Sequence, residues 1–299
     1  MKKRQLLSFE LFPPKTDRGM TNLSETIQQL CRYKPEYISV TYGAGGGNVG
    51  ANRQVCRMVR NAGAVPVTHF TVIRNTKQGI REQLETYLKE GVDHILALRG
   101  DFPRGETTTG GDFNYATDLV KFIRDEFGEQ FEIAVAGSPE GHISCRSLEA
   151  DIGVLKMKQD NGADYIMTQL CWDMEQFERW LDKIRRAGVT LPVDVGIMPI
   201  LDQAATINMA LSRNGCVMDR ELSRLISKYW IFPNPFDKAP FDDSLEQKKA
   251  DFKKAGIEYT IRQIDKYRSL GVEGIHLYAM NKWKDVSQII ERSGIRTLI

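Results

Sequence analysis

The chain has 299 residues, of which 41% are hydrophobic and 27% charged, a composition typical of a globular protein with a sizeable core. Its 41 Lys and Arg against 39 Asp and Glu give a formal net charge of +2, which leaves no basic surplus for a nucleic-acid backbone. No run approaches the roughly 20 apolar residues of a membrane-spanning helix. Pro13 and Pro14 also interrupt the apolar run that a signal peptide needs. We therefore expect a cytoplasmic protein with neither a nucleic-acid nor a membrane partner.

Short apolar runs recur at a nearly constant interval along the chain. The first four begin 30, 29 and 29 residues apart, which is the length of one strand–helix unit. Strands are predicted at 6–12, 36–42, 65–71, 94–98, 132–136, 165–171, 192–198 and 274–279. Helical patterns lie between them at 22–33, 52–61, 77–90, 115–127, 147–161 and 174–187. Eight such units favour a closed (β/α)8 TIM barrel over the rival fold, an open doubly wound sheet.

The residues in excess of a minimal barrel are concentrated between the seventh and eighth strands. Residues 203–229 indicate one or two helices, 232–241 a Pro/Phe-rich turn, and 246–270 a long charged helix. No linker or low-complexity segment divides the chain. We therefore expect residues 1–299 to form a single catalytic domain with an elaborated connection between strands seven and eight.

The first predicted strand places a carboxylate inside the barrel. Side chains alternate along a strand, so the face that begins with Leu7 is expected to pack on the outer helices. The other face, made of Ser8, Glu10 and Phe12, is expected to point into the barrel. A buried carboxylate is costly unless it is paired or protonated. Glu10 is therefore either part of a structural ion pair or a general acid with a raised pKa.

Charged residues follow directly after the fourth predicted strand. The active sites of such barrels lie at the carboxyl ends of the strands, so Arg99, Gly100 and Asp101 mark the functional face. Gly100 would let a ligand approach the backbone closely. Arg-Gly-Asp by itself is a weak signal, because a turn with a surface ion pair has the same sequence.

Two further polar residues come near strand ends. Gln169 lies near the end of the sixth predicted strand and is expected on the face of Met167 and Cys171. Its amide either recognises a planar hydrogen-bonding ring or bonds to the nearby backbone. His69, near the end of the third strand, is the histidine best placed for a site.

Several other motifs are set aside. Gly45, Gly47 and Gly50 have the spacing of a dinucleotide fingerprint, but residues 64–70 lack the acid that would hold a ribose. We predict that this match is false and that the loop is flexible or lies against a ligand. The five cysteines form no C-x-x-C pair and the four histidines show no ligand spacing. Neither a disulfide framework nor a metal site is expected, and a reducing compartment fits best.

Five segments taken together resemble the short bacterial methylenetetrahydrofolate reductases. They are residues 8–15 (SFELFPPK), 40–44 (VTYGA), 98–101 (LRGD), 162–163 with 168–169 (GA and TQ), and 196–199 (GIMP). They stand in the order of that family and span nearly the whole chain. The resemblance implies a (β/α)8 barrel that binds FAD non-covalently and passes a hydride from NAD(P)H to 5,10-methylenetetrahydrofolate, giving 5-methyltetrahydrofolate.

The resemblance also implies roles for individual residues. Glu10 matches the general acid, Asp101 the carboxylate beside flavin and pterin, and Gln169 a contact of folate and nicotinamide. Lys282 stands where the family has an arginine for the folate substrate. The flavin contacts would be Thr41, Tyr42, Ala44, His69, Arg99, Gly100, Asp101, Tyr115, Ala116, His142, Asp151 and Lys158.

The chain departs from the family at five positions. Ser138 replaces an aromatic residue, Val154 and Met157 replace polar or basic flavin contacts, Ala205 replaces a glutamine, and Lys282 replaces the arginine. Two other functions stay open from the residues alone. One is a flavin-free pterin-binding methyltransferase barrel, and the other is a subunit that takes electrons from a partner protein. A homo-oligomer is expected.

Overall fold

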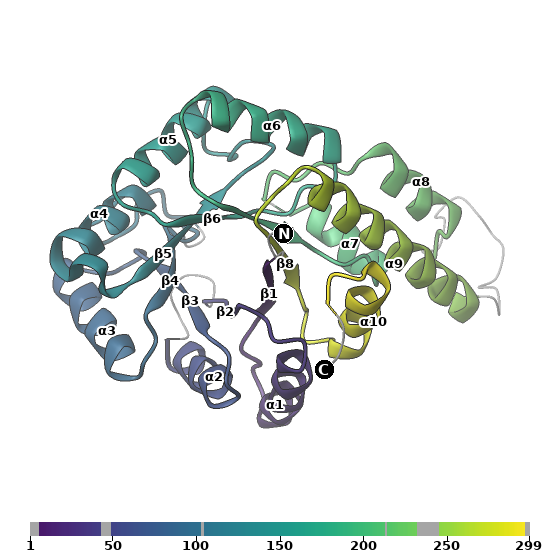
Figure 1. Cartoon of the computed structure of the whole chain (residues 1–299), viewed down its shortest axis with the longest axis horizontal. Coiled ribbons are helices and arrows are strands. Elements are labelled where there is room, and N and C mark those ends of the chain that lie inside the picture. The colour runs from purple at the N-terminus through teal and green to yellow at the C-terminus, as the bar shows by residue number, and fades with distance from the viewer. Residues whose placement is uncertain (1–5, 43–48, 103–104, 213, 232–244, 297–299) are drawn as a thin grey trace, which may run out of the picture.

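The computed structural model describes residues 6–42, 49–102, 105–212, 214–231 and 245–296. Within these residues eight parallel strands close into a barrel in chain order, with β8 hydrogen-bonded back to β1 (Figure 1). The strands are β1 (Leu6–Leu11), β2 (Tyr37–Val40), β3 (Pro66–Thr71), β4 (His94–Leu98), β5 (Glu132–Gly137), β6 (Tyr165–Thr168), β7 (Val193–Ile197) and β8 (Gly274–Tyr278). The predicted TIM barrel is confirmed, and the doubly wound alternative is wrong.

Helices surround this barrel as an outer ring (Figure 1). They are α1 (Asp17–Cys31), α2 (Val49–Asn61), α3 (Lys77–Lys89), α4 (Ala116–Phe127), α5 (Leu148–Asp160), α6 (Met174–Arg186), α7 (Gln203–Ala210), α8 (Arg220–Lys228), α9 (Leu245–Ser269) and α10 (Trp283–Ser293), with the short 3-10 turn η2 (Gly128–Gln130). Helix α1 begins five residues before its predicted start, because the Thr16 hydroxyl accepts a hydrogen bond from Gly19 N and caps it.

The connection between β7 and β8 contains α7, α8 and α9, which confirms the predicted elaboration. The predicted turn at 232–241 lies outside the described residues. A second apolar cluster joins the ends of β6 and β7 to these helices, through residues such as Trp172, Ile200 and Phe252. Helix α9 also donates side-chain hydrogen bonds to the chain after β6. Tyr259 Oη bonds Trp172 O, while Gln263 Nε2 and Tyr267 Oη both bond Cys171 O. The connection is thus built into the wall of the barrel.

The two faces of β1 have different surroundings. Leu7, Phe9 and Leu11 are fully buried in the main apolar cluster between barrel and helices, as predicted. Ser8 is buried on the inner face. Phe12 is 40% exposed and lies beyond the end of the strand, so the prediction that it faces the interior is wrong. Alternation applies only while the backbone stays in the ladder.

Three further expectations concern disulfides, membrane-spanning helices and metal sites. All five cysteines are free thiols, and three of them are buried. Among the described residues, no helix is both long and apolar enough to cross a bilayer. The same residues contain no group of His, Cys, Asp or Glu side chains arranged to hold a metal ion.

Candidate active site

Glu10 lies near the carboxyl end of β1, beside two histidines. Its Oε2 is 3.3 Å from His69 Nε2 and 3.7 Å from His276 Nε2. His69 comes from β3 and His276 from β8, so three strands converge on this carboxylate. The predicted inward orientation of Glu10 is confirmed, and His69 occupies the site for which its position in the third strand made it the best candidate.

The pKa of Glu10 corrects one expectation from the sequence. Burial alone would raise it, but the neighbouring His276 and His69 rings outweigh burial and lower the pKa to about 2. The prediction of a raised pKa is therefore wrong for this structure. Glu10 is ionised at neutral pH and forms the paired carboxylate that was the other interpretation. A proton must be brought to it before it can act as an acid.

His276 connects Glu10 to the barrel interior. Its Nδ1 is 2.8 Å from Ser8 Oγ, and its Nε2 is 3.3 Å from Ser39 Oγ. Burial lowers the pKa of His276, although Glu10 opposes the change, so the ring is neutral at neutral pH. A neutral ring carries one proton. We assign that proton to Nε2, facing Glu10, with Nδ1 accepting from the Ser8 hydroxyl.

Basic side chains gather at the ends of β4 and β5. Lys158 is half-buried on α5, and its Nζ donates to Ala136 O over 2.8 Å. Burial lowers its pKa. Burial also lowers the pKa of His142, and the charges of Arg99 and Lys158 lower it further, against Asp151 and Asp101. Predicted flavin contacts from three segments are therefore close enough to act on one another.

The backbone and the packing around position 100 also require a glycine, apart from any ligand. Its φ of +86° favours glycine, and an added Cβ would lie 2.7 Å from Ile73 Cγ1 and 3.0 Å from Thr71 Cβ. The glycine therefore lets the end of β4 pack against β3. Arg99 is folded back over Phe102, with its guanidinium carbon 4.4 Å from the ring centroid. This holds the arginine in place beside Asp101, which is exposed.

The other predicted flavin contacts lie around this mouth. Thr41 and Tyr42 follow β2, and Tyr42 Oη donates to Gln83 Oε1 over 3.3 Å. Tyr115 caps α4 and is 62% exposed, and Ala116 is the first residue of that helix. Ala44 and the first two glycines of the fingerprint lie outside the described residues.

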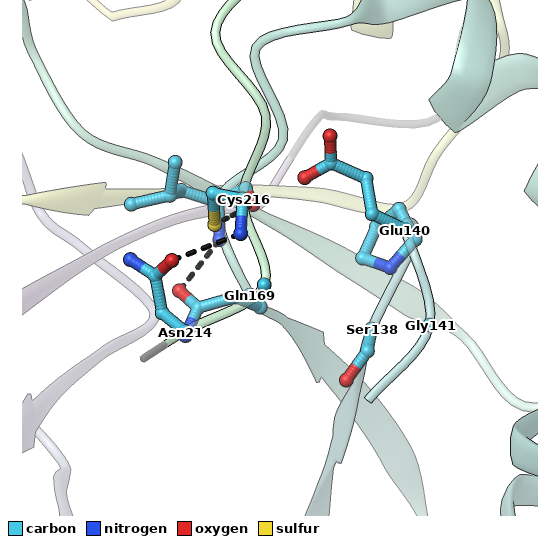
Figure 2. Close-up of a pocket in the computed structure, with 9 residues that line it drawn as sticks. Ser138, Glu140, Gly141, Gln169, Asn214 and Cys216 are labelled. Carbon is cyan, nitrogen blue, oxygen red and sulfur yellow. Dashed lines mark hydrogen bonds between the residues drawn. The ribbon is translucent and has the colours of Figure 1, made fainter. Parts of the chain in front are cut away.

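Gln169 lines a small cavity together with Glu140 (Figure 2). Its Oε1 accepts from Leu170 N over 2.9 Å and from Tyr278 Oη over 3.4 Å. The bond to its neighbour's backbone matches one of the two predicted roles. Strand β6 ends at Thr168, and Cys171 packs in the outer apolar cluster. The prediction that Gln169 shares a face with Cys171 is therefore wrong.

Three of the five departures from the family pattern lie near the residues described above. Ser138 lines the cavity of Figure 2, on the side of Glu140. Met157 is 51% exposed on α5, one residue before Lys158. Lys282 is exposed at the start of α10, next to Asn281, whose side chain bonds the backbone of Phe12 beyond β1. Lys282 thus lies at the same end of the barrel as Glu10.

Three functional neighbours were not singled out from the sequence. His276 and Tyr278 alternate on the inner face of β8, and their register with Ser8 and Glu10 brings them to the site. Alternation along the predicted eighth strand could have found them. Glu140 carried no such signal. Burial raises its pKa to about 7, although Val217 N donates to it from the distant β7–β8 connection.

The fold and site define a parallel-barrel protein with a carboxylate–histidine cluster and a group of basic side chains at the carboxyl ends of its strands. Residues 1–226 match the family model described as methylenetetrahydrofolate reductase. The chain is 30% identical to the 5,10-methylenetetrahydrofolate reductase of Escherichia coli (strain K12) over 291 residues, 97% of this chain and 91% of that protein. The chain belongs to the methylenetetrahydrofolate reductase family.

Eukaryotic relatives show the same likeness over part of their length. The chain is 32% identical to methylenetetrahydrofolate reductase 1 of Schizosaccharomyces pombe, covering 98% of this chain and 47% of the relative. Against methylenetetrahydrofolate reductase (NADH) 1 of Arabidopsis thaliana it is 32% identical, covering 96% and 48%. The chain thus spans about half the length of these relatives. A Clostridium thermocellum protein described as binding two copies of 5-methyl-5,6,7,8-tetrahydrofolic acid has the same fold, with a TM-score of 0.60 at 11% identity and coverage of 98% and 96%.

Proposed function

We propose that this protein reduces 5,10-methylenetetrahydrofolate to 5-methyltetrahydrofolate, with NAD(P)H as the reductant and FAD as the cofactor. The observation that carries the proposal is Glu10 at the barrel mouth, within 3.3 Å of His69, at the position of the family's general acid. Family membership supports the choice of reaction. The free thiols fit a cytoplasmic location, and we further propose one catalytic domain that self-associates.

The donor set at the ends of β4 and β5 fits FAD. A dinucleotide carries an anionic diphosphate, for which a half-buried ammonium and a guanidinium are suitable partners. Lys158 and Arg99 supply these groups, and their combined charge already lowers the pKa of His142. Tyr42, whose ring centroid lies 6.4 Å from that of Phe70, adds an aromatic side chain at the end of β2. A bound flavin would supply reversible hydride chemistry, which amino-acid side chains lack.

The protein's own residues would handle charge and protons. Opening the five-membered ring of the folate leaves a cationic iminium, which the Asp101 carboxylate would stabilise. The departing ring nitrogen needs a proton, which Glu10 would donate once protonated. Gln169, directly after β6, would orient the pterin or the nicotinamide.

The test is an anaerobic titration of purified protein reconstituted with FAD. We expect a yellow protein that bleaches with NADH or NADPH and recovers its colour when 5,10-methylenetetrahydrofolate is added. If dithionite bleaches the protein but NADH and NADPH do not, the electron donor is a partner protein and not NAD(P)H. A protein that stays colourless with FAD and with FMN would overturn the flavin assignment and favour the methyltransferase barrel.

A further inference from the structure

Polar side chains form a column through one side of the barrel interior. The opposite side of the interior is apolar, with Val67, Leu96, Ala134 and Met167. The column has three levels, set by the inward positions of β8. Gly274 pairs in register with Asp194, His276 with Ser8, and Tyr278 with Glu10. The column therefore runs from Asp194, near the amino end of the strands, up to the general acid at the mouth.

Hydrogen-bonding groups follow one another along this column. Tyr37 Oη donates to Asp194 Oδ2 over 2.5 Å. Ser8 pairs in register with Tyr37, and its hydroxyl is close enough to lower the pKa of the Tyr37 hydroxyl. The tyrosine ring also stacks on His276, with centroids 5.8 Å apart. Ser8 Oγ lies 2.8 Å from His276 Nδ1, and the far side of that ring faces Glu10.

The lower end of the column is built around a carboxyl group. Asp194 is 2% exposed, and its Oδ1 has no hydrogen-bond partner. An added Cβ on Gly274 would lie 2.2 Å from that oxygen, so the glycine makes the space that the carboxyl occupies. A buried carboxylate with one unpaired oxygen is costly, and a protonated carboxyl is the state that such surroundings favour.

We propose that Asp194 is the proton store for Glu10, and that Tyr37, Ser8 and His276 carry the proton between them inside the barrel. The inference rests on the proposed function, in which Glu10 donates one proton each time a folate ring opens. The mouth is where the folate binds, so the bound substrate covers the route from solvent to Glu10. A supply through the interior serves the acid while the substrate is in place.

The transfer balances in four linked steps. When Asp194 is protonated, its carboxyl is the donor and Tyr37 Oη the acceptor in the 2.5 Å contact between them. The carboxyl gives its proton to Tyr37 Oη, and the Tyr37 hydroxyl proton passes to Ser8 Oγ. The Ser8 hydroxyl proton passes to His276 Nδ1, and the His276 Nε2 proton passes to Glu10. Asp194 ends as a carboxylate, Glu10 ends protonated, and His276 has changed tautomer while staying neutral. Burial raises the pKa of Tyr37 well above its usual range, so the tyrosine passes the proton without ionising.

The charges around Asp194 support its role as a proton store. Burial, opposed by Tyr37 and assisted by the acids Glu273, Glu36 and Glu132, raises the pKa of Asp194 to about 7. At neutral pH a large part of the molecules therefore holds this proton, whereas Glu10 alone, with a pKa of about 2, holds almost none.

The experiment compares Asp194→Asn and Tyr37→Phe with Tyr165→Phe in the flavin-loaded protein. Tyr165 is the matched control, because its buried hydroxyl belongs to the same interior layer but has no hydrogen-bond partner. Each half-reaction is followed by stopped flow. We expect both column variants to slow reoxidation by 5,10-methylenetetrahydrofolate about 10-fold or more, in line with the worth of a positioned proton donor. Reduction by NADH should stay within about twofold of wild type, and Tyr165→Phe should match wild type in both half-reactions.

Infrared spectroscopy gives a second readout that needs no folate. The wild-type protein should show the carbonyl band of a buried protonated carboxyl, which Asp194→Asn removes and Tyr37→Phe shifts. Wild-type reoxidation in both column variants, or the absence of that band, would overturn the proposal. A wild-type protein that NADH reduces but the folate cannot reoxidise would instead refute the proposed function, and the band would still decide whether Asp194 stores a proton.

Discussion

Replacing Glu10 with glutamine separates the two halves of the proposed reaction. Glutamine keeps the size of the side chain and can still hydrogen-bond to His69 and His276, but it has no acidic proton. Ring opening of the folate needs a proton at the departing nitrogen, whereas hydride transfer from NADH to the flavin does not. We therefore expect Glu10→Gln to remain yellow, to be reduced near the wild-type rate, and to be almost inert toward the folate.

The magnitude follows from the contacts of Glu10. General acid catalysis is commonly worth about 10²–10⁴-fold, or about 3–5 kcal/mol in the barrier. The cost in stability should be small, about 1 kcal/mol, because the contacts to the histidines are 3.3 and 3.7 Å long and the carboxylate is partly solvated. Since the folded pKa is about 2, below the usual glutamate value, the stability that the carboxylate contributes is present above about pH 4.5 and is lost as the pH falls toward 2.

Stopped-flow absorbance of the flavin measures both steps in the same preparation. Urea unfolding of wild type and variant at pH 7 and pH 3.5 measures the stability difference, which should shrink at the lower pH. If reduced Glu10→Gln protein is reoxidised by the folate at the wild-type rate, Glu10 is a purely structural partner of the histidines and the acid lies elsewhere.

Three more predictions address the flavin, the iminium and the interior carboxyl. Asp101→Asn removes the negative charge but keeps the shape of the side chain. In stopped flow it should slow folate reduction by about 10–1000-fold and slow flavin reduction less. Equal slowing of both steps would show that Asp101 contributes only its shape to the site. Lys158→Met should weaken flavin binding by about 10–100-fold in an equilibrium fluorescence titration. The control Lys156→Met, which only breaks an exposed ion pair with Asp160, should leave the flavin affinity unchanged. Equal losses of flavin affinity in the two variants would show a general effect of removing positive charge. Asp194 has a folded pKa of about 7, above that of an unfolded aspartate, so the stability of wild type relative to Asp194→Asn should be greatest below about pH 4. It should fall as the pH rises through 7, by up to about 4 kcal/mol in urea unfolding; a difference that does not vary with pH would contradict the assignment.

The barrel could be predicted because each unit repeats the same signal. Apolar runs of strand length recur about every 29 residues in the first half of the chain, and a closed parallel barrel is the compact arrangement that buries eight of them. Element ends were harder, because they depend on caps. Thr16 starts α1 earlier than the apolar pattern does, and β6 stops at Thr168 although apolar residues continue to Trp172.

The site was predictable only in part, because strand alternation predicts which way a side chain points but not which residues it contacts. Alternation placed Glu10 inside the barrel, yet its pKa depends on His69 and His276, which lie 59 and 266 positions along the chain. Burial without these partners would give the opposite shift. The neighbours of Asp194 and Glu140 likewise come from remote segments, and only the closed barrel brings them together.

Helix α9 limits how this barrel can be re-engineered. A designer who replaced the long β7–β8 connection with a short loop would remove the three donors Tyr259, Gln263 and Tyr267 at once. The carbonyls of Cys171 and Trp172 would then need new donors or solvent, since an unpaired buried acceptor costs about 1–3 kcal/mol. These carbonyls stand two and three positions after Gln169. A transplanted minimal connection would therefore disturb the position of Gln169, the proposed contact of the pterin or the nicotinamide, before it unfolded the barrel.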